Sequence, residues 1–414
     1  MKRVVFLFNH DAAHQVAHLA GVAAAMARDH AGICTIIACA PAIRGAVQSA
    51  MGADAAALAQ WQDLQLPPWL DRVARVGNAL FPAARLARLA HFAPMLQSAD
   101  MVVSTERTCL RVQARMRKLA KAPRMRKMAK TARMRKMDGG RVPPFAIIPH
   151  GAGDRNVSYH PDFARFDLVM VAGKKVVDAM VAAGVPAQRL HIIGYPKFDM
   201  VDFSPRPSPF ANGRPTFVYN PHFDPHLSRW YRHGPDILRW FASDAGQQFN
   251  LIFAPHVMLF RKRWHISPEY RVVARRPDIP AVAHGAANIH IDVDSPALFD
   301  MTHMLSADAY IGDMSSQIYE FLARPRAAFF IDTHDGFSSL TDPARTGAAA
   351  EHQHMRAGPV AVDAASLIAH LPGWANVAQD YRAAQEQLFN WTFDTSATPA
   401  SRRAAACIAT ALGA

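Results

Sequence analysis

The 414-residue sequence contains only four cysteines, and they form no recognisable metal or redox motif. Cys34 and Cys39 lie in the apolar stretch AGICTIIACA, with a spacing that matches neither a zinc knuckle nor a CxxC pair. Cys109 and Cys407 are isolated in the sequence. We therefore expect all four to be reduced thiols, in the core or at the surface.

Long apolar runs are also missing. No stretch reaches the roughly 18 consecutive apolar residues that a membrane-spanning helix needs. After the basic start MKR, the apolar run covers only residues 4–8 and ends at Asn9, His10 and Asp11, which is too short for a signal peptide. The start of the chain is expected to form a buried strand, and the protein is expected to be cytoplasmic, either soluble or peripheral to a membrane.

Acidic residues are nearly absent from one segment, residues 111–141. This segment holds thirteen lysines and arginines and one acidic residue, Asp138, so it supplies twelve of the thirteen net positive charges of the chain. It contains three similar nine-residue units, ARMRKLAKA, PRMRKMAKT and ARMRKMDGG. A helix is expected on either side of Pro123, which would break or restart it. The basic charge thus belongs to one insert and not to the fold as a whole.

Three interpretations of this insert compete. As a membrane anchor, it would place basic side chains on anionic head groups while Met116, Leu119 and the later methionines enter the interface. Nucleic-acid binding is disfavoured, because the insert has no aromatic residue for stacking and the rest of the chain is nearly neutral. A solvated loop without a partner is the third. The expected membrane contacts are Arg115, Arg117, Lys118, Arg124, Arg126, Lys127, Arg133, Arg135 and Lys136.

Strand patterns alternate with helix patterns along both halves of the chain. In the first half, strands are expected at 4–8, 34–40, 101–104, 145–151, 167–173 and 191–196. The helices between them are expected at 12–29, 43–62, 67–98 and 174–184. In the second half, strands are expected at 216–222, 250–256, 288–294, 309–313 and 327–332. Such alternation predicts parallel sheets covered by helices on both faces.

Four prolines in residues 201–215 predict a stiff linker and a domain boundary. We expect an amino-terminal, acceptor-side Rossmann-like domain at 1–202, which carries the basic insert. A nucleotide-donor-binding Rossmann-like domain is expected at 203–375. The helices of 376–414 are expected to pack back on the first domain.

Polar residues follow several of the predicted strands, where open parallel sheets bind ligands. His150 and Gly151 follow one strand of the first half, and a histidine there can act as a general base while the glycine lets the backbone approach a ligand. An incidental turn histidine is the alternative. In the second half, Asp313 ends a strand, and Ser315 and Ser316 then open a helix whose hydroxyl and N–H groups can bind phosphate or simply cap the helix.

Two further histidines of the second half, His222 and His256, also follow predicted strands. A metal site at His222, Asp224 and His226 is the weaker alternative, because no matching ligand cluster follows at a suitable spacing. No metal and no cofactor are expected.

Taken together, these motifs resemble the CDP-glycerol glycerophosphotransferase family. The most specific similarity is the block SPALFDMTHMLSADAYIGDMSSQIYEF at 295–321, supported by the strand-Pro-His at His256 and the His-Gly turn at His150. The resemblance implies an α/β protein of the GT-B type, with two Rossmann-like domains, a cleft between them and a carboxyl-terminal helix that crosses back.

The resemblance also implies an activity at the inner face of the cell membrane. Such enzymes move glycerol phosphate, or a related polyol phosphate, from a CDP-activated donor to a hydroxyl of a lipid-linked teichoic-acid or capsule polymer. By position, the catalytic residues would be His150, as the base, and His256, in contact with the donor pyrophosphate. The donor-binding residues would be Gly151, His222, Asp313, Ser315 and Ser316.

Two other functions stay open. The same fold would suit a nucleotide-sugar glycosyltransferase or a UDP-sugar 2-epimerase, although an epimerase needs several carboxylates around the sugar and the first domain offers few. A catalytically silent module that binds a membrane or nucleic acid through the basic insert is the third possibility.

Overall fold

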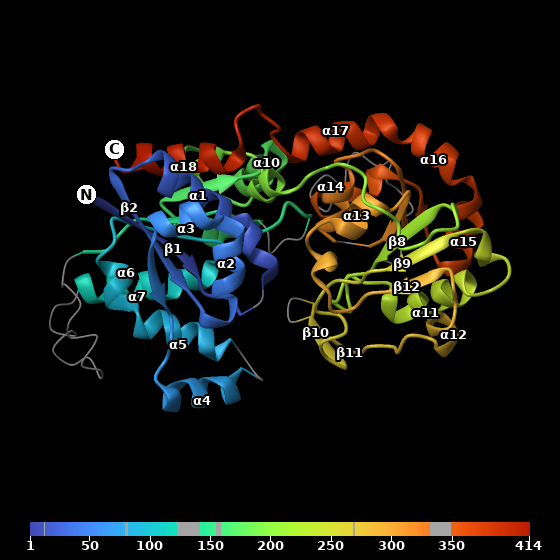
Figure 1. The fold of residues 1–414 in the computed structure, drawn as a ribbon, viewed down its shortest axis with the longest axis horizontal. Helices are drawn as coiled ribbons and strands as arrows, with labels where there is room; N and C mark the ends of the chain where they lie inside the picture. Colours follow the sequence, from blue (N-terminus) through green and yellow to red (C-terminus); the bar gives the residue numbers. More distant parts are fainter. Residues whose placement is uncertain are drawn as a thin grey trace. The chain divides into compact units, whose positions relative to one another are not determined.

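A computed structural model describes residues 1–11, 13–78, 82–121, 141–154, 159–267, 270–313, 315–331 and 349–414. These residues form two compact units (Figure 1). The first unit comprises Met1–His150, Tyr159–Met200 and Phe393–Ala414. The second comprises Gly151–Ser158 and Val201–Thr392. Each unit is built on its own parallel sheet.

The sheet of the first unit has the strand order β3-β2-β1-β4-β5-β6-β7 in the described part of the chain. Its strands are β1 (Lys2–Phe8), β2 (Ile33–Cys39), β3 (Gln60–Asp63), β4 (Met101–Ser104), β5 (Phe145–Ile147), β6 (Leu168–Val171) and β7 (Leu190–Ile192). All neighbours are parallel, with Val5 of β1 opposite Ile36 of β2 and Val102 of β4. The central strands are buried along their length because helices cover both faces, which explains their continuous apolar sequences.

The helices of the first unit fill the connections between these strands. They are α1 (Ala20–Asp29), α2 (Arg44–Met51), α3 (Ala53–Leu58), α4 (Pro68–Gly77), α5 (Ala83–His91), α6 (Ala93–Gln97), α7 (Leu110–Lys121), α10 (Lys174–Ala182) and α18 (Ala400–Ala411). Short 3-10 segments include η1 (Ala13–His18) and η7 (Pro196–Met200).

The carboxyl-terminal helix α18 packs on α1, in the same core as the first sheet. Both helices are rich in alanine, and small side chains let two helices approach closely. The carboxylate of Asp199 accepts hydrogen bonds from the first backbone N–H groups of α18, at Ala400 (3.1 Å) and Ser401 (2.6 Å). These N–H groups have no partner inside their own helix, so Asp199 fixes where α18 begins.

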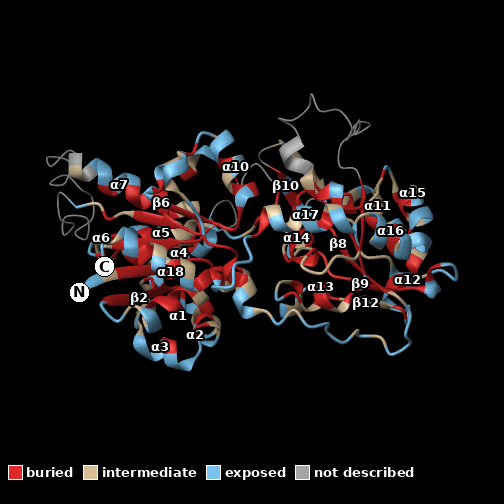
Figure 2. Cartoon of the chain, turned by 90° about the horizontal axis from the view of Figure 1, so that it is seen from above, coloured by how far each residue is buried: buried red, intermediate tan, exposed pale blue. Residues whose placement is uncertain are grey.

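The second unit repeats the same topology in the order β12-β9-β8-β13-β14-β15. Its strands are β8 (Thr216–Asn220), β9 (Asn250–Phe253), β12 (Ile289–Ile291), β13 (Ala309–Gly312), β14 (Ala327–Ile331) and β15 (Val360–Ala361). Its helices are α11 (Trp230–Phe241), α12 (Ala281–His284), α13 (Thr302–Ser306), α14 (Gln317–Phe321), α15 (Ala364–His370), α16 (Trp374–Asp380) and α17 (Arg382–Thr392). An antiparallel hairpin of β10 (Trp264–Ser267) and β11 (Val272–Arg275) stands beside the sheet. In each unit, buried residues gather on the strands and exposed residues on the outer helix faces (Figure 2).

Several local predictions were wrong. Residues 43–62 were expected to be one helix, but α2 and α3 are separated at Gly52, and β3 then forms the edge of the sheet. The sequence QWQD of β3 carries no apolar run because an edge strand is only partly buried, so periodicity did not reveal it. The hairpin β10–β11 and the short β15 were not predicted.

Two predicted helices also differ from the structure. Within 12–29, the first described turns are the 3-10 segment η1, and the α-helix starts only at Ala20. The region 67–98 is divided into α4, α5 and α6. The predicted strands end a few residues early, at Ile147, Asn220 and Phe253, so the polar residues beyond them lie in loops.

Candidate functional site

Each sheet has one place where the direction of the connections reverses. From β1 the chain moves to β2 and β3 on one side, and β4 then lies on the other side of β1. The same reversal separates β8 from β13 in the second sheet. Open α/β sheets bind ligands at the carboxyl ends of the strands at such a point. Ligands are therefore expected at the loops after β1, β4 and β5, and at those after β8, β9 and β13.

In the second unit, Asp313 follows β13 directly and organises the loop after β8. One carboxylate oxygen accepts a hydrogen bond from the backbone N–H of His222 (2.8 Å). The other accepts hydrogen bonds from the N–H of Arg229 (2.8 Å) and the hydroxyl of Ser228 (2.9 Å). Burial raises the pKa of Asp313 to about 6, although these hydrogen bonds and the charge of His354 act in the opposite direction. Asp313 therefore holds the loop after β8 to the end of β13.

His222 and His256 come together at this edge, with ring centroids 5.1 Å apart. Nδ1 of His222 accepts a hydrogen bond from the backbone N–H of Asp224 (3.0 Å), and Nδ1 of His256 accepts one from the N–H of Met258 (3.2 Å). A backbone N–H can only donate, so the neutral form of each imidazole carries its proton on Nε2. Both rings thus present an Nε2–H donor, which suits contact with an anion and does not suit proton abstraction.

Ser315 and Ser316 lie between Asp313 and α14. The N–H of Ser315 donates to the carbonyl oxygen of Asp313 (2.7 Å), and the Ser315 hydroxyl accepts from the N–H of Gln317 (3.3 Å). Ser315 is buried, whereas Ser316 is half-buried. The helix begins as predicted after Ser316, but it spans only Gln317–Phe321, so its dipole is small. In this segment, a ligand would be bound by hydroxyl groups and loop N–H groups and not by the end of a long helix.

The two glycines after His150 lie against Ser316. Gly151 has φ +140°, a backbone conformation that residues with a side chain rarely adopt. A Cβ atom on Gly153 would lie 3.2 Å from Cβ and 3.3 Å from Cα of Ser316. Segment 151–154, which belongs to the second unit, therefore approaches Ser316 in a way that only glycine allows without displacement.

A buried polar network, which the sequence did not suggest, anchors the same segment. Asp154 accepts a hydrogen bond from the hydroxyl of Tyr319, and its second oxygen accepts one from the backbone N–H of His354 (2.9 Å). That oxygen also lies 2.8 Å from Nδ1 of His354. All three residues are at most 2 % exposed. Asp154 and His354 are 200 residues apart in the chain, and no local motif marks such a pair.

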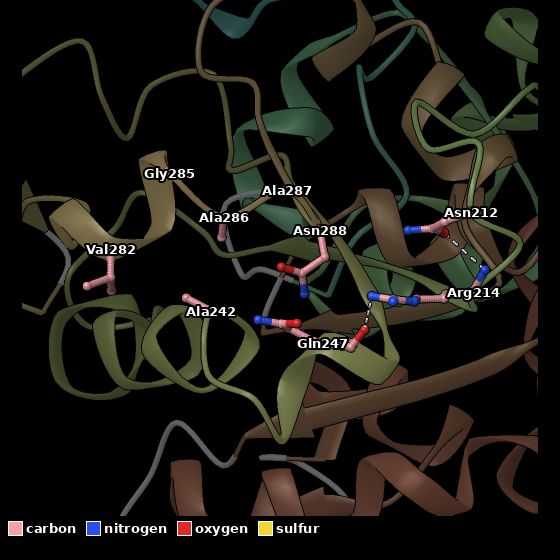
Figure 3. Close-up of a pocket in the computed structure, with 9 residues that line it drawn as sticks. All are labelled: Asn212, Arg214, Ala242, Gln247, Val282, Gly285, Ala286, Ala287 and Asn288. Atoms are coloured by element: carbon pink, nitrogen blue, oxygen red, sulfur yellow. Dashed lines mark hydrogen bonds between the residues drawn. The ribbon is translucent and has the colours of Figure 1, made fainter.

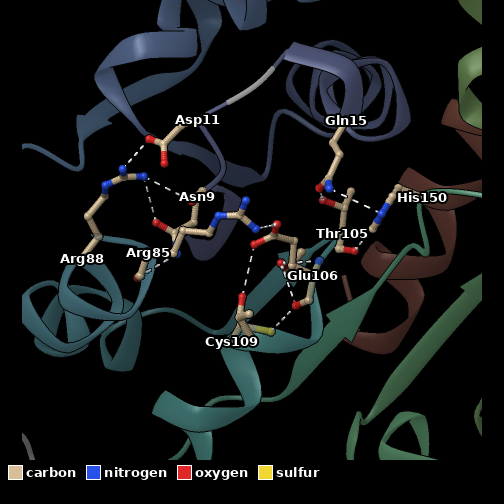
Figure 4. Close-up of polar contacts among 11 residues, drawn as sticks. Asn9, Asp11, Gln15, Arg85, Arg88, Thr105, Glu106, Cys109 and His150 are labelled. Atoms are coloured by element: carbon tan, nitrogen blue, oxygen red, sulfur yellow. Dashed lines mark hydrogen bonds and ion pairs between the residues drawn. The ribbon is translucent and has the colours of Figure 1, made fainter. Parts of the chain in front are cut away.

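In the first unit, His150 lies just beyond β5 and is held in one tautomer (Figure 4). Its Nδ1 is 3.2 Å from the carbonyl oxygen of Thr105, which can only accept, so Nδ1 carries the proton. The Thr105 hydroxyl donates to Oε1 of Gln15 (3.2 Å), which leaves the Gln15 amide nitrogen to face Nε2 of His150 at 3.4 Å. Nε2 therefore bears the lone pair, and the ring is exposed. This is the arrangement that a general base needs.

The carboxylates near His150 are already paired. Glu106 receives hydrogen bonds from Arg85 (2.7 Å) and from the Thr108 hydroxyl (3.2 Å). Asp11 forms an ion pair with Arg88 (Figure 4). Glu106 follows β4 and Asp11 follows β1, where a ligand would be expected. Their carboxylate oxygens are bound to these arginines.

The alternative metal site at His222, Asp224 and His226 is occupied by other contacts. Asp224 accepts from the N–H of His226 (2.9 Å) and from the hydroxyl of Ser267 (2.8 Å). The His226 ring stacks on Tyr270 at 3.7 Å. Within the described ranges, no three His, Cys, Asp or Glu side chains gather in a way that would hold a metal ion.

A cavity of about 540 Å³ lies at the opposite edge of the second sheet (Figure 3). Its walls include Arg214, Gln247 and Asn288, which precede β8, β9 and β12. Arg214 donates to the carbonyl oxygen of Gln247, and Asn288 donates to the carbonyl oxygens of Phe241 (2.8 Å) and Phe249 (2.9 Å). These polar groups join loops at the amino ends of the strands, away from the predicted site.

The basic insert is only partly described. Its first helix, α7, places Arg115, Arg117 and Lys118 on the exposed side. Met116 was expected to enter a membrane interface, but it is 1 % exposed and packs in the core, because it lies on the inner face of α7 one turn after buried Val112. Arg124, Arg126, Lys127, Arg133, Arg135 and Lys136 lie outside the described residues. No helix in the described ranges is long and apolar enough to cross a membrane.

Comparison with known proteins identifies solved structures of similar fold. No model of a protein family and no curated protein sequence matches the chain. Among solved structures, the wall teichoic acid polymerase TagF in a CDPG soak is similar over 100 % of this chain and 89 % of its own, with 13 % identity and a TM-score of 0.54. The S. aureus MnaA–UDP co-structure is similar over 100 % of this chain and 97 % of its own, with 12 % identity and a TM-score of 0.57. A putative UDP-N-acetylglucosamine 2-epimerase from Listeria monocytogenes is similar over 100 % of this chain and 96 % of its own, with 11 % identity and a TM-score of 0.56.

At these identities the similarity concerns the fold. The chain is an α/β protein with two Rossmann-like parallel sheets and a carboxyl-terminal helix that contacts α1. Its fold is GT-B-like, which confirms the fold class expected from the sequence.

Proposed function

We propose that this protein is a transferase that moves glycerol phosphate, or a related polyol phosphate, from a CDP-activated donor to a hydroxyl of a membrane-linked cell-surface polymer. The donor-binding residues are His222, His256, Ser315 and Ser316, with Gly151 letting the backbone approach and Asp313 holding the loop. His150 is the general base. The solved structures of similar fold include TagF in a CDPG soak and the MnaA–UDP co-structure.

The observation that carries the proposal is the opposite tautomer of the histidines in the two units. His222 and His256 have Nδ1 as acceptor and Nε2–H as donor. His150 has Nδ1–H as donor and Nε2 as the basic atom. A transfer from a nucleoside diphosphate donor requires both kinds, donors for the phosphate charge and a base for the incoming hydroxyl.

In the proposed reaction, Nε2 of His150 takes the proton of the acceptor hydroxyl as its oxygen attacks the phosphorus that bears the polyol. The new P–O bond forms while the bond to the bridging oxygen breaks, and CMP leaves with the electron pair. The Nε2–H groups of His222 and His256, with the hydroxyl of Ser316, stabilise the charge that accumulates on the phosphate oxygens.

The paired carboxylates of the first unit favour this reaction over epimerisation. An epimerase moves protons on a sugar and depends on carboxylates in contact with it. Glu106 and Asp11 are bound to Arg85 and Arg88, and releasing either would leave a charge without its partner. A UDP-sugar 2-epimerase or a nucleotide-sugar glycosyltransferase therefore stands second.

The exposed basic side of α7 supports a peripheral association with the inner face of the membrane. Arg115, Arg117 and Lys118 share this side, and the basic repeat continues beyond it in the sequence. Each such residue near an anionic surface contributes about 1 kcal/mol. Nucleic acid is not expected as a partner.

Thermal unfolding in the presence of CDP, CDP-glycerol, UDP, UDP-sugars and GDP tests the donor class, because a ligand of the native state raises its melting temperature. We expect stabilisation by the cytidine compounds that is lost in the double variant Ser315→Ala, Ser316→Ala. CMP release from CDP-glycerol with a polyol-phosphate acceptor tests the reaction. A response to UDP-sugars alone would replace the proposal with the second candidate, and no response to any nucleotide would favour a catalytically silent binding module.

A further inference from the structure

Four histidines and a lysine of the first unit gather around the loop after β1. His10 follows β1, while His14 and His18 lie on η1. His150 follows β5, and Lys197 lies on η7, which packs against η1. The ring centroids of His18 and His150 are 6.4 Å apart, and those of His10 and His14 are 6.5 Å apart. Three separate chain segments thus bring five basic side chains to the carboxyl edge of one sheet.

Most of this cluster is withdrawn from water. His10, His18 and Lys197 are 1 %, 6 % and 4 % exposed, His14 is half-buried, and His150 is exposed. Burial of basic groups beside one another is costly, because desolvation and mutual repulsion both disfavour the charged forms. Apolar side chains of similar size would not carry this cost.

The charges acting on His18 all have the same sign. Burial lowers its pKa well below the ordinary value, and Lys197, His150, His14 and His10 lower it further. Among the described residues, no hydrogen-bond partner reaches Nδ1 of His18. The ring edge lies against Tyr195, with centroids 5.2 Å apart. The site therefore contains a buried polar atom without a partner inside a region of positive potential.

We propose that His10, His14, His18 and Lys197 form a binding site for a phosphate group, next to His150 and made entirely by residues of the first unit. A dianion would pair with Lys197, accept hydrogen bonds from the imidazoles and favour their protonation. The site differs from the donor-binding residues of the second unit, and it does not require the proposed transferase reaction. If that reaction is correct, the site would hold a phosphate of the acceptor beside the base.

Titration calorimetry of the full chain with inorganic phosphate, in a buffer of chloride salts, tests this site. We expect saturable binding that weakens as the pH rises from 6 to 8, because fewer imidazoles are protonated. His18→Gln and Lys197→Gln are each expected to weaken binding by about tenfold or more. The matched controls His191→Gln and Lys174→Gln change exposed residues of the same unit and should leave the affinity unchanged.

A second measurement avoids the risk that a buried substitution unfolds the protein. In wild-type protein with labelled histidines, saturating phosphate should raise the pKa of two or more imidazoles of the cluster in NMR titrations. Glycerol 3-phosphate should produce the same shifts, and uncharged glycerol should not. The proposal would be overturned by wild-type protein that binds no phosphate between pH 6 and 8. Binding that leaves every imidazole pKa of the cluster unchanged, or that persists in folded His18→Gln and Lys197→Gln, would overturn it equally.

The nucleotide measurements keep the two proposals separate. Stabilisation by CDP without phosphate binding would overturn the phosphate site and leave the transferase proposal in place. Phosphate binding without any nucleotide response would do the reverse.

Discussion

The carbonyl oxygen of Thr105 lies 3.2 Å from Nδ1 of His150, and this single contact decides which nitrogen of the ring is basic. With the proton fixed on Nδ1, the exposed Nε2 has the lone pair, and Gln15 faces it through a long contact of 3.4 Å. An incoming hydroxyl can replace that weak contact. The role predicted for His150 from its position after a strand is thus chemically consistent with its surroundings.

Replacing His150 with glutamine should abolish proton abstraction while keeping the protein folded, because the side chain is exposed. We expect CMP release to fall by about 10²- to 10⁴-fold, the usual contribution of a general base, with little change in the CDP-dependent rise in melting temperature. Steady-state kinetics and thermal unfolding of the same preparation measure both. His191→Gln, at another exposed histidine of this unit, is the control. Equal turnover in His150→Gln and wild-type protein would remove His150 from the mechanism.

The raised pKa of Asp313 predicts an unusual dependence of the free energy of unfolding on pH. Its pKa of about 6 in the folded protein is above the ordinary value of 3.8, so between these values the folded state binds a proton that the unfolded state has released. The contribution of this group to the free energy of unfolding is therefore greatest below pH 4 and declines as the pH rises to 6, by on the order of 3 kcal/mol.

Urea unfolding of wild-type protein and Asp313→Asn from pH 4 to 7 measures this contribution. The variant should lack the decline, although it is expected to be less stable overall because its amide nitrogen would face the N–H of Arg229. Asp300→Asn, at an exposed aspartate of the same unit, should follow the wild-type curve. Parallel curves for Asp313→Asn and wild-type protein would show that the carboxyl group titrates normally.

The positions of the strands along the chain followed from the sequence better than the site did. β4 was predicted to the residue, because a fully buried parallel strand is a continuous apolar run, whereas β3 was missed because QWQD at a sheet edge has no such run. Asp313, Ser315 and His256 could be selected because each follows a strand. Asp154, His354 and Tyr319 could not, because their association depends on how segments far apart in the chain meet in the folded unit. The same holds for Lys197, which acts on the charge of His18 although the two residues are remote in sequence.

Gly153 provides a test of how closely the loop must approach Ser316. A methyl group at this position would lie 3.2 Å from Cβ of Ser316 and would push the serine or the loop aside. We expect Gly153→Ala to weaken CDP binding by about tenfold in calorimetry, the effect of losing roughly one hydrogen bond to a charged group. Gly285→Ala is the matched control in the same unit, because nothing lies within 4 Å of its Cβ position. A similar loss in both variants would indicate a general effect on stability and not a local one.

The exposed basic side of α7 predicts binding to anionic membranes, and this binding can be tested independently of catalysis. Replacing Arg115, Arg117 and Lys118 together with glutamine removes three positive charges while leaving Met116 in the core. At about 1 kcal/mol for each charge, binding to vesicles that contain phosphatidylserine should weaken by roughly 100-fold at low salt. Flotation of the protein with vesicles of increasing anionic content measures this change.

The matched control for this surface is the substitution of Arg261, Lys262 and Arg263 with glutamine, since these three side chains are also exposed and the net charge changes equally. If α7 faces the membrane, the control should float as the wild type does, because a bilayer attracts only charges within about a Debye length of its surface. Equal weakening in both triple variants would mean that the total charge of the protein, and not the position of α7, determines attachment. Turnover with a soluble acceptor should be unchanged in the α7 variant, since none of its three residues lies at the ends of β5, β8, β9 or β13.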